Sequence, residues 1–220
     1  MNSILLILVF LGTAYAFSPR FMPARLRIGA LRCEQSGDAM EQSSLGDGVG
    51  VEEAPVTDLS KMEIRVGTIT EISTHPDADT LYVEKVDVGE EDGPRTIVSG
   101  LVAFCSAEEL LNRKVVVLCN LKPRAMRGIT SAGMLLCGSN DDHSKVEPLL
   151  VPDGTPNGEL ITFEGHASAP IEPGNKSSKI YGKICDNFKV NELGEATYEG
   201  VVFATSGGAI KSSFISGSIS

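Results

Sequence analysis

The chain has 220 residues, of which 42% are apolar and 5% aromatic, and it contains no Trp. This length suits one ordinary domain with extra segments or two small domains, and the apolar share is sufficient for a packed core. Acidic residues outnumber basic ones by 29 to 19, for a net charge of −10. This disfavours a uniformly basic nucleic-acid binder and one that relies on base stacking, so any nucleic-acid contact must come from a local basic strip.

The N-terminal segment has the pattern of a signal peptide. An apolar run over residues 4–11 is followed by Ala14-Tyr15-Ala16. The run is too short to span a bilayer, and the small residues around Tyr15 fit a cleavage site. We therefore expect a signal peptide over residues 1–16.

Residues 17–33 carry four Arg and no acidic residue, which is typical of an organelle transit peptide. With Phe17 after the expected cleavage point, the whole leader resembles the bipartite plastid presequence of algae with secondary plastids. That resemblance implies plastid localisation through the secretory route, and simple secretion is the alternative. Residues 34–60 are rich in Gly, Ser and acidic side chains and are expected to form a disordered acidic linker.

A β-rich domain is predicted over residues 61–165. Alternating or apolar runs indicate five strands at 64–70, 81–88, 95–98, 115–121 and 133–138. Gly67 suggests a bulge or bend in the first strand. Residues 75–79 suggest a turn and a helix start capped by Asp77, and Ser106 and Glu109 have the spacing of a capping box.

Five short strands with a helix between the third and fourth predict an all-β fold, the OB-fold. This is a five-stranded Greek-key barrel whose strand face and loops bind oligonucleotides. Periodicity alone leaves other small barrels open. After the fourth predicted strand, Lys122, Arg124 and Arg127 form a basic strip in a stretch that has no acidic residue between Glu109 and Asp141.

Signals for catalysis or metal binding are weak. The three His residues (His75, His143 and His166) lack metal-ligand spacing, and the five Cys residues form no close pair. Buried, hydrophobic thiols are the expected state of these Cys residues. The chain has no P-loop, no G-x-S-x-G and no dinucleotide fingerprint. We expect no enzyme activity, no metal and no cofactor.

Several strings carry a family resemblance: R-V-G-T-I at 65–69, H-P-D-A-D-T-L-Y-V-E-K-V-D-V-G at 75–89, R-T-I-V-S-G-L at 95–101, and N-L-K-P-R-A-M-R-G-I-T-S at 120–131. Together they resemble the tRNA-binding domain of the endothelial monocyte-activating polypeptide II family, which includes a component of the synthetase complex and extensions of some tyrosyl- and methionyl-tRNA synthetases. The resemblance implies a non-catalytic protein that holds tRNA by its shape and by phosphate and sugar contacts. The candidate RNA-binding residues are Lys85, Arg95, Ser99, Asn120, Lys122, Arg124, Met126, Arg127 and Ser131.

The type of side chain predicts the contact each candidate makes. Lys and Arg would touch phosphates, and Asn and Ser would bond sugar hydroxyls or base edges. Met126 suits either a wedge against a base or core packing. Several relatives carry a Lys-rich segment before the domain, whereas here that segment is acidic, so we expect modest affinity, about micromolar.

The residues after Gly165 resemble, more loosely, a C-terminal extension of eukaryotic family members. In those relatives the extension packs on the barrel and imitates the partner subunit of dimeric bacterial relatives. This implies an extension over 166–211, a monomeric protein, and a flexible tail over 212–220, where Gly and Ser dominate.

Partners are expected to be tRNA and, as a candidate, an aminoacyl-tRNA synthetase assisted in trans, with no membrane association after processing. The net acidity favours an alternative, a protein-interaction or chaperone-like module with a weakened RNA site, which the basic strip opposes. A secreted cytokine-like factor is a further alternative, and the Arg-rich leader opposes it.

Overall fold

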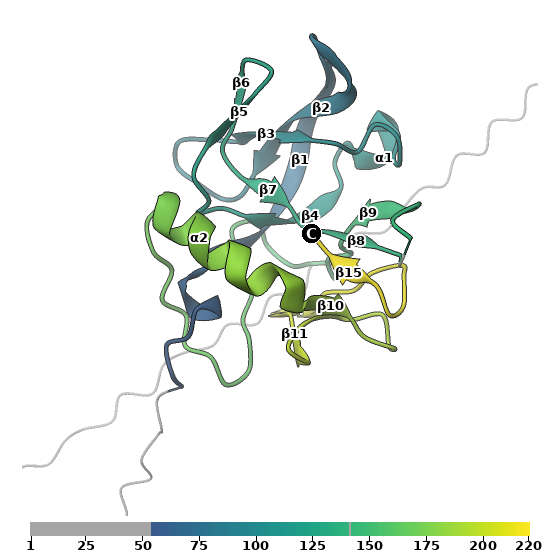
Figure 1. Ribbon diagram of the computed structural model, residues 1–220. Helices are drawn as coiled ribbons and strands as arrows, with labels where there is room; N and C mark the ends of the chain where they lie inside the picture. Colours follow the sequence, from purple (N-terminus) through teal and green to yellow (C-terminus); the bar gives the residue numbers. More distant parts are fainter. Residues whose placement is uncertain (1–53, 141) are drawn as a thin grey trace, which may run out of the picture. The chain divides into compact units, whose positions relative to one another are not determined.

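A computed structural model describes residues 54–140 and 142–220 (Figure 1). The signal peptide and transit-like segment predicted from the sequence lie outside these residues, as does most of the predicted linker. The linker was expected to reach residue 60, but this boundary is wrong. The 3-10 helix η1 (Leu59–Lys61) already belongs to the folded unit, because Leu59 and Ser60 are buried.

Five antiparallel strands form the barrel: β1 (Ile64–His75), β2 (Ala78–Asp87), β3 (Arg95–Ser99), β4 (Lys114–Leu118) and β7 (Met134–Leu135). They are ordered β3-β2-β1-β4-β7. The two edge strands of this sheet are β3 and β7. They are brought together where the Ala132 N–H, just before β7, donates to the Thr96 carbonyl of β3 at 2.9 Å. Helix α1 (Ala107–Leu110) lies between β3 and β4 and begins with the predicted capping box of Ser106 and Glu109. The β-rich, OB-like fold is therefore confirmed.

Two local predictions in the first hairpin are wrong. Pro76 and Asp77 form a two-residue turn between β1 and β2, and no helix starts there. The bulge in β1 lies between Ile69 and Glu71. Gly67 instead permits a close approach of strands, since an added Cβ would lie 2.9 Å from the Asp87 carbonyl oxygen.

The core has two parts, and β4 is buried between them. Val115 and Val117 pack inside the barrel, whereas Val116 and Leu118 pack against the C-terminal extension, in a cluster that includes Phe188. Because both faces of β4 are covered, its sequence is a continuous apolar run. Three of the cysteines, Cys105, Cys119 and Cys137, are buried and free as expected.

The extension contains α2 (Asn175–Ile184), η2 (Cys185–Asn187), β10 (Phe188–Val190), β11 (Ala196–Tyr198), β12 (Val201–Val202) and β15 (Ser218–Ile219). A small hairpin of β13 (Ala204–Thr205) and β14 (Gly208–Ala209) follows β12. Strands β10, β11, β12 and β15 join β8 (Cys137–Ser139) and β9 (Val146–Pro148) in a second sheet, ordered β12-β11-β10-β15-β8-β9. The extension thus shares a sheet with β8 and β9, the strands that follow the barrel strand β7 (Figure 1).

The flexible tail expected over 212–220 is wrong for its last residues. Ser218 pairs with Lys189 of β10 and with Ser139 of β8, and Ile219 pairs with Gly138. Ile219 is buried in the core shared with the extension. Backbone pairing and one apolar side chain hold a stretch whose Gly- and Ser-rich composition suggested disorder.

Candidate nucleic-acid interface

The predicted basic strip forms an exposed hairpin. Strands β5 (Arg124–Met126) and β6 (Ile129–Ser131) pair in a two-stranded ribbon that extends from the barrel (Figure 1). Its turn residues, Arg127 and Gly128, have φ angles of 47° and 91°. Positive φ at both central positions is the geometry of a type I′ turn, which matches the twist of a hairpin.

Three cations of this hairpin segment, Lys122, Arg124 and Arg127, are exposed. Across the described residues, none of the three forms an ion pair with a carboxylate. Met126 is half-buried at the end of β5. The hairpin therefore presents positive charge that the acidic remainder of the protein does not neutralise, which is what phosphate contacts require.

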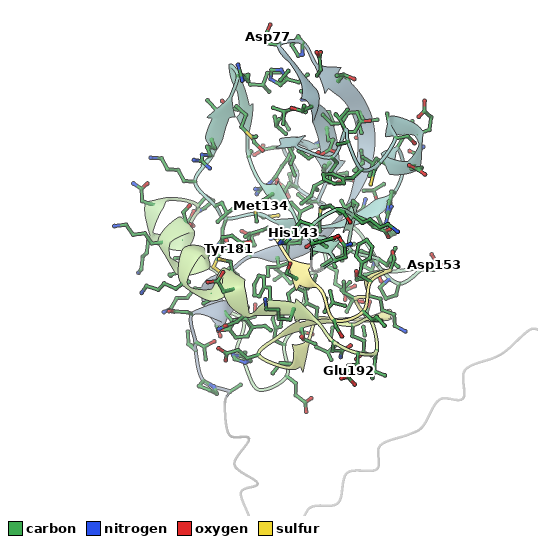
Figure 2. All side chains as sticks on the ribbon, turned by 45° about the vertical axis from the view of Figure 1, so that its right-hand side comes forward. Asp77, Met134, His143, Asp153, Tyr181 and Glu192 are labelled. Atoms are coloured by element: carbon green, nitrogen blue, oxygen red, sulfur yellow. The ribbon has the colours of Figure 1, made fainter. Side chains whose placement is uncertain are left out.

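The hairpin tip is attached to the turn between β1 and β2. The His75 ring is buried, and its Nδ1 accepts from the Asp77 N–H at 3.1 Å. The proton therefore lies on Nε2, which donates to the Met126 carbonyl at 3.1 Å. Asp77 marks the tip of the β1–β2 hairpin in Figure 2. The loops between strands one and two and between strands four and five of an OB-fold are those that bind oligonucleotides, and here they are bonded to each other.

Arg95, a predicted RNA contact, is half-buried and bonds within the fold. It forms a two-pronged ion pair with Glu90, with 2.7 Å between Nε and Oε2. Its Nη1 donates to the carbonyls of Cys119 at 2.6 Å and Ala132 at 2.9 Å. The bond to Glu90 raises the pKa of Arg95. These bonds connect β3 to the ends of β4 and β6, and they occupy both edges of the guanidinium that could bind a phosphate.

Asn120 also bonds within the fold, and its predicted RNA contact stays a prediction. Its side chain is buried and donates to the carbonyls of Lys61 at 2.8 Å and Ile171 at 2.9 Å. Its Oδ1 accepts from the Glu63 N–H at 3.1 Å. All hydrogen-bonding groups of the amide except one lone pair are used within the fold, so Asn120 joins β1 to the extension.

The two predicted serines are engaged in the fold as well. Ser131 is buried, accepts from the Val98 N–H at 3.0 Å and donates to the Gly133 carbonyl at 3.0 Å. Ser99 is half-buried and donates to the Glu84 carboxylate at 2.8 Å. Both hydroxyl protons are thus donated within the fold, and the RNA contacts of Ser99 and Ser131 stay predictions.

Lys85 lies on the outer face of β2, half-buried, with Nζ 2.9 Å from the Thr96 hydroxyl. Four predicted residues, Lys122, Arg124, Met126 and Arg127, thus lie together in the hairpin segment, whereas Lys85 belongs to β2. Three further cations were missed: Lys176, Lys179 and Lys183 of α2 are all exposed. Their i, i+3, i+7 spacing in an acid-free stretch was the available signal.

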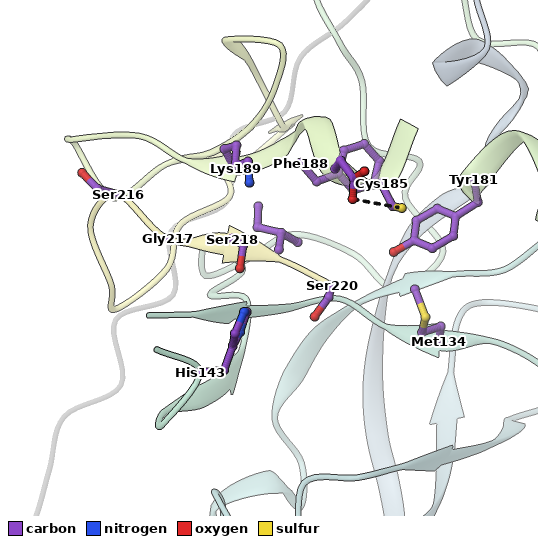
Figure 3. A pocket seen from close by; sticks show the side chains of 12 residues that line it. Met134, His143, Tyr181, Cys185, Phe188, Lys189, Ser216, Gly217, Ser218 and Ser220 are labelled. Carbon is purple, nitrogen blue, oxygen red and sulfur yellow. Dashed lines mark hydrogen bonds between the residues drawn. The ribbon is translucent and has the colours of Figure 1, made fainter. Parts of the chain in front are cut away.

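A groove of about 690 Å³ lies between α2 and β15 and includes Tyr181, Lys189 and His143 in its lining (Figure 3). The His143 ring lies 3.0 Å from the Ser139 hydroxyl, which is also bonded to Ser218 at 2.9 Å. The bond between Ser139 and Ser218 joins β8 to β15, and no carboxylate among the residues described is bonded to the His143 ring.

Residues 54–140 and 142–220 contain no group of three or more His, Cys, Asp and Glu side chains that could hold a metal ion. No helix in the same part of the chain is long and apolar enough to cross a membrane. Burial raises the pKa of Cys119 and of Cys137 to about 12, which keeps both thiols protonated.

A small antiparallel barrel with two bonded loops, one of them basic and exposed, defines an OB-type nucleic-acid-binding module. Residues 64–160 match the family described as the tRNA binding domain. The crystal structure of the C-terminal domain of Plasmodium vivax p43 superposes with a TM-score of 0.66 at 36% identity, covering 74% of this chain and 98% of that one. This chain belongs to the tRNA-binding domain family, which confirms the resemblance found in the sequence.

Two curated relatives are longer proteins. A probable methionine–tRNA ligase of Oryza sativa subsp. japonica is 45% identical over 186 residues, covering 84% of this chain and 23% of that protein. The aminoacyl tRNA synthase complex-interacting multifunctional protein 1 of Cricetulus griseus is 40% identical over 176 residues, covering 80% of this chain and 48% of that protein. The chain therefore spans less than half the length of either relative.

Proposed function

We propose that this chain is a non-catalytic tRNA-binding protein whose RNA contacts centre on the β5–β6 hairpin. The observation that carries the proposal is the exposed, unpaired set of Lys122, Arg124 and Arg127 in a protein of net charge −10. Membership of the tRNA-binding domain family supports tRNA as the ligand. Phosphate contacts supply affinity, and the fixed placement of two loops supplies selectivity for a shape.

The mechanism is one of holding rather than reacting. The three cations neutralise phosphates of one backbone segment, and Met126 adds apolar contact at the foot of the turn. The bond between His75 and Met126 keeps the hairpin at a fixed angle to the barrel, so less conformational entropy is lost when RNA binds. With about three to five phosphate contacts, affinity falls with salt at a slope of a few units.

The names of the relatives support a role beside an aminoacyl-tRNA synthetase, to which the bound tRNA would be presented in trans. We place this activity in a plastid, on the basis of the leader over residues 1–33, and we assign a monomer, on the basis of the resemblance of the extension. A fluorescent fusion of residues 1–60 tests the first of these. Secretion of the fusion protein would overturn it. Sedimentation of the purified protein tests the second.

The test of function is a salt titration of tRNA binding to the full chain, with duplex DNA as competitor. Binding that weakens with salt and resists DNA is expected. The double variant Arg124→Gln, Arg127→Gln should lower the salt slope by about two units. The control Lys145→Gln, Lys211→Gln makes the same charge change at exposed positions elsewhere and should leave the slope unchanged.

The acidic net charge is the one observation that favours a protein-interaction module instead. Absence of tRNA binding at low salt would favour the protein-interaction module over the tRNA-binding function. Equal effects of the two double variants would show that binding depends on net charge and not on the hairpin.

A further inference from the structure

Helix α2 carries a row of cations that the barrel-centred site does not include. Lys176, Lys179 and Lys183 are exposed. Because residues three and four apart share a helix face, the three lie on one side of the helix. The apolar face of the helix is formed by Ile180 and Ile184, which are buried in the core shared with the barrel. The lysine row lies beside this buried face of the helix and is open to solvent.

The start of α2 is bonded to the segment that leads into the basic hairpin. Leu121 and Gly174 form a parallel bridge. The Lys122 N–H donates to the Ser178 hydroxyl at 3.0 Å. The Ser177 hydroxyl donates to the Asn120 carbonyl. Hairpin and helix are consequently neighbours held at one fixed position, and both lie on the same flank of the molecule in Figures 1 and 2.

The charge around the helix is favourable for an anion. No acidic residue occurs within residues 173–185, and none of the three lysines forms an ion pair with any described carboxylate. Asp58 is the carboxylate whose pKa responds to Lys183, but the pKa of Asp58 is lowered first by its hydrogen bond from Lys61 at 2.7 Å. Asp58 is thus already paired with Lys61.

The geometry points to a composite RNA-binding surface in which α2 continues the β5–β6 hairpin. We propose that Lys176, Lys179 and Lys183 contact phosphates of the same tRNA that the hairpin holds. At about 1.5 Å rise per residue, the row from Lys176 to Lys183 is about 10 Å long, enough to follow several consecutive phosphates of one strand. The extension would then add affinity to the three hairpin-segment cations, which form no ion pair with the described carboxylates. This inference rests on the function proposed above.

The test compares two triple variants of the full chain. Lys176→Gln, Lys179→Gln and Lys183→Gln are combined in one, and Lys145→Gln, Lys189→Gln and Lys211→Gln in the other, all at exposed positions. Gln keeps the helix propensity close to that of Lys, and circular dichroism checks folding. We expect the α2 variant to lower the salt slope of tRNA binding by about two units and affinity by about tenfold at low salt. The control should change the slope by less than half a unit.

A second measurement uses the unmodified protein. Brief acetylation with and without tRNA, followed by mass spectrometry, should show protection of the three α2 lysines and of Lys122 but not of Lys145 or Lys211. If the hairpin variant loses binding while the α2 variant binds normally and its lysines stay reactive, the composite surface is wrong and the hairpin function stands. If the wild-type chain does not bind tRNA at all, the proposed function fails and the inference fails with it.

Discussion

The His75 ring joins the two loops of the candidate interface, because its Nε2–H donates to the Met126 carbonyl at 3.1 Å. The ring is fixed in that tautomer by the Asp77 N–H, which donates to Nδ1 at 3.1 Å. Both ring nitrogens of the buried His75 are therefore bonded within the protein. It positions the carbonyl next to Arg127, the residue at the hairpin tip.

Replacing His75 tests this positioning role. His75→Ala should weaken tRNA binding about fivefold, the equivalent of one net hydrogen bond, and should leave the salt slope unchanged because no phosphate contact is lost. His75→Gln offers a donor near the position of Nε2 and should recover part of the affinity. A reduced salt slope in either variant would mean that His75 itself contacts RNA as a cation. Hydrogen exchange at the hairpin amides should be faster in the Ala variant.

Arg127 should show opposite effects on stability and on binding. Its φ of 47° is in the left-handed region, which costs a non-glycine residue about 1 kcal/mol or more and which Asn tolerates better in a type I′ turn. Arg127→Asn is therefore expected to raise the free energy of unfolding by about 0.5–1 kcal/mol and to lower the salt slope of tRNA binding by about one unit. Urea unfolding and a salt titration measure the two.

The control for Arg127 is Arg124→Asn, since Arg124 lies within β5 and has no positive φ. That variant should lose binding without any gain in stability. If the Arg127→Asn protein binds tRNA as tightly as wild type, Arg127 does not contact the RNA. Its positive φ would then have no functional explanation.

How far the sequence predicts this fold is best seen at β4. Its apolar run predicted a buried strand correctly, because burial on both faces leaves a continuous pattern. The five strands and the capped helix followed from equally local signals. The paired tail at β15 could not be predicted, since its partners Gly138 and Lys189 are distant in the chain.

The site was predictable as a segment but not residue by residue. Lys122, Arg124 and Arg127 are exposed as expected. Arg95 and Asn120 lie in equally characteristic strings, yet both face inward and bond backbone carbonyls. A family motif contains residues that stabilise the fold as well as residues that contact the ligand. Only the three-dimensional contacts separate the two groups.

Asn120 provides the sharpest test of that separation. Asn120→Ala would leave the Glu63 N–H and the carbonyls of Lys61 and Ile171 without their partner. Loss of about 2–4 kcal/mol in the free energy of unfolding is expected, because buried unpaired groups each cost about 1–3 kcal/mol. At a temperature where the variant remains folded, tRNA affinity and salt slope should stay near wild type. A large drop in affinity without loss of stability would restore Asn120 to the RNA site.

Glu84 makes stability depend on pH. It is buried on β2, Oε1 accepts from the Ser99 hydroxyl at 2.8 Å, and Oε2 has no partner among the described residues. Burial raises its pKa from 4.5 to about 7. The folded state therefore holds a proton that the unfolded state releases at lower pH, so stability should fall as pH rises from about 4.5 to 7 and then level off.

The total loss should be of the order of 3 kcal/mol by linkage, at about 1.4 kcal/mol per pKa unit. Glu84→Gln remains neutral throughout, so it should match wild type near pH 4.5 and be the more stable protein above pH 7. Glu71→Gln, which neutralises an exposed carboxylate on the neighbouring β1, serves as the control and should reproduce the wild-type pH profile. Urea unfolding at a series of pH values measures all three proteins. A constant difference between Glu84→Gln and wild type across the whole range would show that the pKa of Glu84 is the same in the folded and unfolded protein.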